Sequence, residues 1–128
     1  MSALYTKGEA AYVTQTTTSG TTIGTDTVSI PLNSICQWEL QANGMDTAGN
    51  GYSIRLSGVT KRGTAGNIAA LGSAIPAEFT NADAGIGAAA ALVNLNTTSN
   101  ALEIGVTGVA AKTINWDCRL AYRLSTFV

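Results

Sequence analysis

The sequence predicts an all-β protein, an antiparallel β-sandwich of jelly-roll or Greek-key type with about eight strands. Several stretches alternate apolar and polar residues, most clearly Thr113 to Leu124, which is typical of strands with one buried face. These stretches are short, fairly evenly spaced and separated by turns of Gly, Asn, Asp and Thr. No amphipathic segment with a helical period is longer than two turns.

The 128 residues predict a single β-sandwich domain, residues 21–128, preceded by an extended N-terminal arm, residues 1–20. The arm is dominated by Thr, a β-former with little to bury. Its candidate partner-binding residues are Leu4, Tyr5, Tyr12 and Val13. Disorder of this arm in the free protein is the alternative.

The first half of the domain predicts a long hairpin. Val28, Ile30 and Leu32 alternate in a short strand that precedes it, closed by Pro31 and Asn33. The two hairpin strands follow as SICQWELQA and YSIRLSGVTKR, joined by the turn-rich NGMDTAGNG. Their apolar faces consist of Cys36, Trp38, Leu40 and Ala42 on the first strand and Tyr52, Ile54 and Leu56 on the second.

The second half predicts weaker strands followed by two strong ones. Residues 68–87 contain one or two short strands, and the run Ala88 to Ala91 could begin a helix by propensity. We favour a strand after this run, because Gly87 precedes it and polar Asn residues interrupt any helical face. The apolar residues of that strand are Leu92, Val93 and Leu95, and those of the next strand are Leu102, Ile104 and Val106.

Together these faces predict a core of Trp38, Leu40, Ile54, Leu56, Leu102, Ile104, Val106, Ile114, Trp116 and Leu120. The stretch CQW at Cys36 mirrors WDC at Cys118. If the two strands pair antiparallel with the cysteines opposite each other, the tryptophans are opposite as well. We expect two buried free thiols beside aromatic side chains. A disulfide in this thiol pair would need a Cα separation of roughly 4.4–6.8 Å.

Residues that could carry catalysis are scarce. The chain has no His, which removes the usual general base and the Ser-His and Cys-His nucleophile pairs. Glu39 and Asp117 could approach each other, but both lie on polar faces near arginines, so a solvated charge cluster is favoured over a catalytic pair. The loop MDTAGNG lacks the repeated carboxylates and closing Glu of a calcium loop. We therefore expect no enzyme activity, no cofactor and no metal site.

Charge and hydropathy exclude several partners. Charged residues make up 12% of the chain and the net charge is -1, so we expect no nucleic-acid partner. No apolar stretch approaches the roughly 20 residues of a membrane span, and the N-terminus lacks a secretory signal. Synthesis in the cytoplasm without export is the expectation. A sparsely charged surface rich in Thr, Ala and Gly is suited to packing against other protein subunits.

The stretch LEIGVTGVAAKTINWDCRLAYRL is similar to the closing strands of β-sandwich modules in tailed-bacteriophage virion proteins. The shared features are an alternating strand with a Thr-Gly end, a short turn with Lys-Thr, and a final strand with Trp. The hairpin CQWELQANGMDTAGNGYSIRLSGVTKRG also resembles theirs, with Lys61 and Arg62 before a Gly/Thr turn. The resemblance extends from Ile35 to Leu124.

This resemblance implies a structural protein of the virion. Such modules occur in tail fibres, tail spikes, baseplate parts and capsid decoration proteins, and many assemble as trimers. Because this chain has no long stalk and no coiled-coil heptads, it looks more like a capsid decoration (cement) protein, a homotrimer that binds the major capsid protein or other virion subunits. The alternative is a tail-fibre or tail-adaptor component that binds host glycan. The aromatics near expected turns or chain ends, Tyr52, Phe79 and Phe127, are few for such a role.

Overall fold

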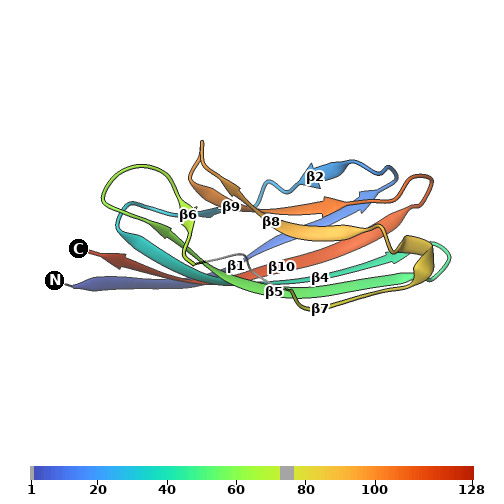
Figure 1. Cartoon of the computed structure of the whole chain (residues 1–128), viewed down its shortest axis with the longest axis horizontal. Helices are drawn as coiled ribbons and strands as arrows, with labels where there is room; N and C mark the ends of the chain where they lie inside the picture. Colours follow the sequence, from blue (N-terminus) through green and yellow to red (C-terminus); the bar gives the residue numbers. More distant parts are fainter. Residues whose placement is uncertain (1, 73–76) are drawn as a thin grey trace.

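The computed structural model describes residues 2–72 and 77–128, which form ten strands and one short 3₁₀ helix in two antiparallel sheets (Figure 1). The strands are β1 (Ala3–Thr16), β2 (Thr21–Ile23), β3 (Val28–Ser29), β4 (Ser34–Asp46), β5 (Gly51–Arg62), β6 (Ala69–Ala70), β7 (Ala77–Ala82), β8 (Ala90–Asn96), β9 (Ala101–Thr107) and β10 (Ile114–Phe127), with the helix η1 at Ala84–Ile86. The predicted β-sandwich is confirmed. Part of the region expected to hold weak strands, residues 73–76, lies outside the described residues.

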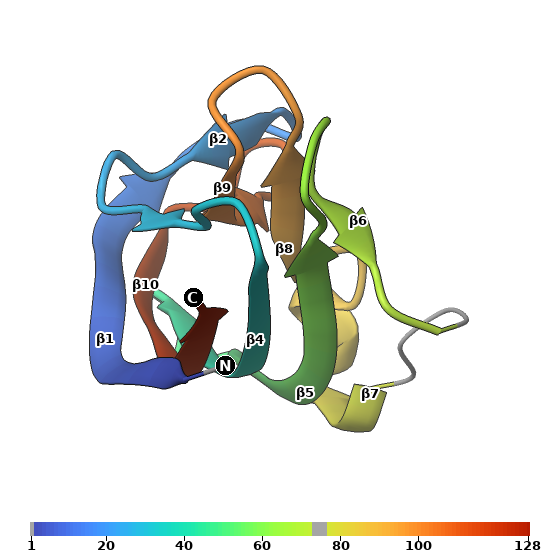
Figure 2. The ribbon, with the colours of Figure 1, turned by 90° about the vertical axis from the view of Figure 1, so that its left-hand side faces the viewer.

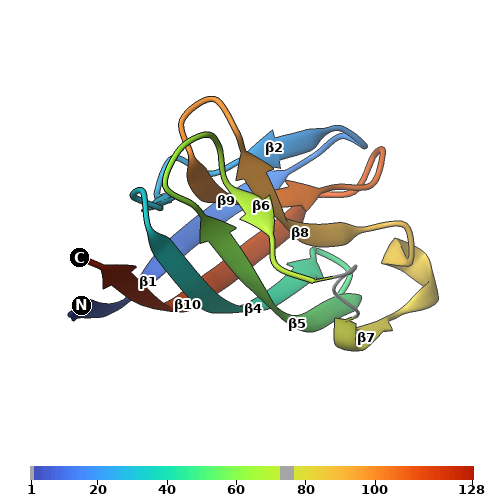
Figure 3. The same ribbon diagram turned by 60° about the vertical axis from the view of Figure 1, so that its left-hand side comes forward.

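The two sheets form two layers of unequal length. The large sheet has the order β1-β10-β4-β5-β6, and β7 also pairs with β5; the small sheet has the order β2-β9-β3, and β8 pairs with β9. Figure 2 shows the layers from the end that carries the termini, and Figure 3 shows β1, β10, β4 and β5 side by side. Both termini extend past the small sheet at this end (Figure 1).

The predicted long hairpin is present as β4 and β5. Residues of β4 alternate between buried and solvent-facing along the strand, as the sequence indicates. Asp46 shapes the turn, because its carboxylate accepts hydrogen bonds from the backbone N–H groups of Ala48 at 3.0 Å and Asn50 at 2.8 Å. Gly49 supplies the positive φ of 87° that this turn needs. The loop MDTAGNG is therefore held by its own hydrogen bonds.

The core lies between the two layers. Nine of the ten residues predicted for it are buried, and Leu56 is partly buried beside a register irregularity between β5 and β7. Trp116 packs edge-to-face against Tyr52 with ring centroids 5.4 Å apart. Both indole N–H groups are satisfied inside the core by threonines, Trp116 by Thr16 at 2.9 Å and Trp38 by Thr60 at 3.1 Å. Burying these large side chains therefore leaves no indole donor unpaired.

The two cysteine-bearing strands pair, but not in the register that would place the cysteines opposite each other; both thiols are buried and free, as expected. Cys118 on β10 lies opposite Ala42 on β4, whereas Cys36 lies opposite Leu124, so the pairing is displaced by six residues. At roughly 3.3 Å per residue this separation is far too long for a disulfide. The physical reason is space: Trp116 lies opposite Gly44, where an added Cβ would be 2.9 Å from the indole Cε3. A register with the two tryptophans opposite each other would crowd both indoles.

The segment expected to form an arm is extended and lies within the large sheet. Strand β1 pairs with β10 along its whole length, from Ala3 opposite Phe127 to Thr16 opposite Ile114. Ala10 and Thr16 are buried against the core, and Gly8 and Tyr12 are partly buried. Most inward side chains of β1 are small, as at Gly8, Ala10 and Thr16, which explains why its alternation is weak in the sequence.

Candidate interaction surface

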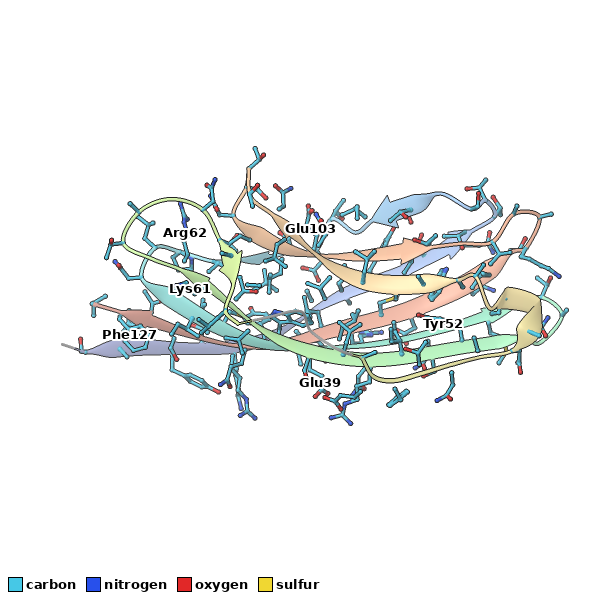
Figure 4. All side chains as sticks on the ribbon, in the orientation of Figure 1. Glu39, Tyr52, Lys61, Arg62, Glu103 and Phe127 are labelled. Carbon is cyan, nitrogen blue, oxygen red and sulfur yellow. The ribbon has the colours of Figure 1, made fainter. Side chains whose placement is uncertain are left out.

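Exposed apolar side chains gather at the end of the sandwich that carries both termini. Leu4, Tyr5 and Val128 are each more than 60% exposed, and Ile35 and Phe127 are 37% and 38% exposed. The strand register places Tyr5, Ile35 and Phe127 near one another on the outer face, because Ser125 lies between Tyr5 and Ile35 and Ala3 lies opposite Phe127. Leu4 and Val128 belong to the same end of the sheet but point to its other face. Figure 4 places Phe127 at this end of the large sheet. These five residues are called the terminal patch below.

The outer edge of β1 is open next to the terminal patch. Ser2 and Val128 exchange both backbone hydrogen bonds, so even-numbered residues of β1 point their N–H and C=O groups at β10. Odd-numbered residues point theirs away from the sheet. Ala11 donates its outward N–H to the Asp26 carboxylate at 2.9 Å. From Ala3 to Glu9, the side of β1 that faces away from β10 pairs with no strand among the described residues, and this side is called the open edge.

The four predicted arm residues have different environments. Leu4 and Tyr5 belong to the terminal patch. Val13 is 66% exposed but lies nine residues further along, beyond the Asp26 contact. Tyr12 is partly buried, and its hydroxyl donates to Thr22 Oγ1 at 3.1 Å. The structure therefore places Leu4 and Tyr5 next to each other at the open end of β1, on opposite faces of the sheet, and leaves Tyr12 and Val13 outside the terminal patch.

The outer face of the large sheet carries two clusters of paired charges. Arg55 contacts Glu39 at 2.9 Å and Glu78 at 3.2 Å, and Glu39 projects away from the small sheet (Figure 4). The hydrogen bond from Arg55, followed by that from Gln41, holds the pKa of Glu39 below its usual range. The other cluster joins Arg119 to Asp117 at 2.8 Å and to Glu9 at 3.9 Å.

The two carboxylates considered for catalysis belong to these separate clusters. Glu39 lies opposite Ala121 on β10, four residues along from Asp117. Each carboxylate is paired with its own arginine. The structure therefore does not bring Glu39 and Asp117 together as an acid and nucleophile.

A hollow of about 700 Å³ opens on the same outer face, between the paired charges and the terminal patch. Its lining includes Lys7 on β1, Arg123 and Ala121 on β10, and Gln37 and Glu39 on β4. Lys7 lies directly opposite Arg123, and Arg123 lies opposite Gln37. Sequence reasoning missed this hollow, because the neighbours depend on a strand register that alternation does not specify.

The two thiols lie inside the sandwich and are free. Burial raises the pKa of Cys36 to about 11 and is the main cause that raises the pKa of Cys118 to about 12. Both side chains are therefore protonated and weakly nucleophilic near neutral pH. They act as small apolar core residues.

In the part of the chain that the structure describes, no helix is long and apolar enough to cross a membrane. Within those same residues, no three or more Cys, Asp or Glu side chains are grouped as metal ligands. No protein-family model matches this sequence, and no curated protein matches it.

Proposed function

We propose that this chain is a non-enzymatic structural subunit of a bacteriophage virion, a capsid decoration protein that binds the assembled shell as a trimer. The observation that carries the proposal is the open edge of β1 beside the terminal patch. The resemblance of residues 35–124 to virion β-sandwich modules supplies the virion context. The proposed location is the virion, and the proposed partners are the major capsid protein and further copies of this chain.

An open strand edge is suited to assembly because its backbone groups can pair with a strand of another subunit. The outward N–H and C=O groups of Ala3, Tyr5, Lys7 and Glu9 provide such a row. Leu4 and Tyr5 alternate along the same stretch, so an added strand would cover one apolar side chain on each face. Backbone pairing would supply affinity, and these side chains would supply specificity.

The rest of the surface also favours packing against protein. Away from Lys7 and Arg123, the outer face of the large sheet mixes polar side chains with the charges of Glu39, Arg55, Asp117 and Arg119, which are already paired within the chain. An interface formed there would bury few unpaired charges, whose burial is costly. Many copies on a symmetric shell would add up modest individual contacts.

Copy number tests the virion location directly. Virions of the phage that encodes this chain would be purified and analysed by quantitative mass spectrometry against the major shell protein. Hundreds of copies per particle are expected for a decoration protein. A handful of copies would favour the alternative, a tail-fibre or tail-adaptor component. Absence from the particle would contradict the virion role.

Reattachment to shells that lack the chain tests the surface. The double variant Leu4→Ser/Tyr5→Ser is expected to reattach at least about tenfold more weakly than the parent, because it removes two exposed apolar contacts. Met45→Ser is the matched control, since Met45 is 56% exposed at the opposite end of β4. Equal reattachment of all three proteins would rule out the terminal patch as the contact.

A further inference from the structure

Two cations face each other on the outer face of the large sheet without a counter-charge. Lys7 and Arg123 lie directly opposite each other. Because the backbone groups of Lys7 point away from β10, the two residues form a non-hydrogen-bonded pair. In such pairs the side chains approach most closely. Like charges placed opposite each other destabilise a sheet. In the described parts of the chain, no salt bridge involves either residue. The fold therefore tolerates a small cost at this position.

The acidic groups nearest to this cation pair are already engaged. Glu39 accepts hydrogen bonds from Arg55 at 2.9 Å and Gln41 at 3.0 Å. Glu9, two residues along from Lys7 on the same face, lies 3.9 Å from Arg119. The positive charge of Lys7 and Arg123 is consequently left for an anion from outside the chain.

The hollow beside the cation pair is lined with groups that bind hydroxyls. On the outer face, Ala121 of β10 lies between Glu9 of β1 and Glu39 of β4. Because its side chain is only a methyl group, it leaves room above the sheet. Gln37 offers an amide, and the Ser57 hydroxyl, which donates to Glu78 at 3.0 Å, can still accept a hydrogen bond. The volume of about 700 Å³ suits a small molecule of one or two rings.

We propose that this hollow binds a uronic acid, a sugar that carries a carboxylate on a hydroxylated ring. The carboxylate would lie between Lys7 and Arg123 in charge-assisted hydrogen bonds. The ring hydroxyls would contact Gln37, Ser57 and Glu39. A sugar is favoured over an acidic peptide because the polar groups surround a hollow and do not follow a strand edge. The inference is independent of the assembly role, since a strand added at the open edge leaves the outer face uncovered.

Titration of the full chain with D-glucuronate, followed by backbone amide NMR, tests the proposal. Saturable shifts are expected at Gln37, Ala121 and Arg123, with a dissociation constant on the order of 1 mM for a single sugar. D-glucose, the matched neutral sugar, should give no saturable shift. Acetate and a hexaglutamate peptide should each bind at least about tenfold more weakly, because they lack the ring hydroxyls.

Variants separate ligand binding from folding. Lys7→Gln and Arg123→Gln should each weaken glucuronate binding by about tenfold or more. Their melting temperatures should equal or exceed that of the parent, because each variant removes the like-charge pair. Lys61→Gln is the matched control: Lys61 is a cation on the outward face of β5 that does not line the hollow. It should bind like the parent.

Three results would overturn the proposal. Absence of saturable glucuronate binding would show that the hollow is not a sugar site. Equal binding of acetate would show that the cation pair attracts any carboxylate without recognising a ring. Tighter binding of hexaglutamate would assign the surface to an acidic peptide.

Discussion

The inner face of the large sheet carries Leu40, Trp116 and Leu120, each 2% exposed or less, whereas neighbouring residues of the same strands, such as Gln41 and Arg119, face solvent on the outer side. The inner face is matched to the small sheet, and each tryptophan has a threonine partner. The outer face has no covering layer in the described part of the chain, and its charges are arranged in clusters. One set of strands thus places the core on one face and the solvent-facing charges on the other by alternation alone.

Trp116→Ala should have the largest effect on stability. Trp116 is 2% exposed and packs against Tyr52, so its loss should cost about 3–5 kcal/mol of unfolding free energy. Urea denaturation followed by circular dichroism would measure this. Asn115→Ala, one residue earlier and on the outer face, should change stability by roughly 0.5 kcal/mol or less. Similar losses for the two variants would refute the division between the faces.

Gly44→Ala should also destabilise the protein, although only one methyl group is added. Its Cβ would lie 2.9 Å from Trp116 Cε3 and 3.1 Å from Ile114 Cγ2, and such overpacking costs about 1–3 kcal/mol. Gly51→Ala is the matched control, because its Cβ would meet nothing closer than 3.8 Å. Thermal unfolding of both variants would test the register of β4 on β10. A fully stable Gly44→Ala protein would contradict that register.

The buried thiols should make stability fall at alkaline pH. The ordinary thiol pKa is 9.0, and that of Cys118 is raised to about 12 in the folded protein, mainly by burial. Below pH 9 the Cys118 thiol keeps its proton in the folded and in the unfolded chain, so stability is intact. Above pH 9 the thiol ionises first in the unfolded chain, so the free energy of unfolding falls as the pH rises toward 12. Urea denaturation between pH 7 and 11 should show a shallower decline for Cys118→Ala than for the parent. Parallel declines would show that Cys118 is not buried.

Glu39→Gln/Asp117→Asn should have the smallest effect. Both carboxylates are in solvent-exposed ion pairs, whose loss costs about 1 kcal/mol or less each. Shell reattachment should be unchanged, because neither residue lies in the terminal patch or the open edge. Loss of attachment without loss of stability would mean that the partner also contacts the middle of the outer face.

The faces of the long strands could be predicted from sequence because alternation has a fixed period. The register that pairs Cys36 with Cys118 differs from the observed one by six residues. Because six is an even number, each side chain stays on the same face of the sheet, so Trp38 and Trp116 are on the inner face in both registers. The register itself depends on the fit of Trp116 over Gly44, which is a tertiary contact. No local pattern in the sequence reports such a fit.

The candidate surfaces were less predictable than the core. Leu4 and Tyr5 could be selected as exposed apolar residues, but their place beside Phe127 requires the pairing of the two chain ends. Lys7 and Arg123 are 116 positions apart in the chain and became neighbours only through β1 and β10. Contacts between such distant residues are set by the fold and leave no spacing signal in the sequence.

Amide hydrogen exchange in the free and shell-bound states tests the central claim most directly. The outward amides of Tyr5, Lys7 and Glu9 should exchange rapidly in the free chain, because nothing pairs with them among the described residues. On the shell they should be protected at least about tenfold, while the amides of Leu40 and Leu120 are slow in both states. Equal, rapid exchange at Tyr5, Lys7 and Glu9 in the two states would contradict assembly through the open edge of β1.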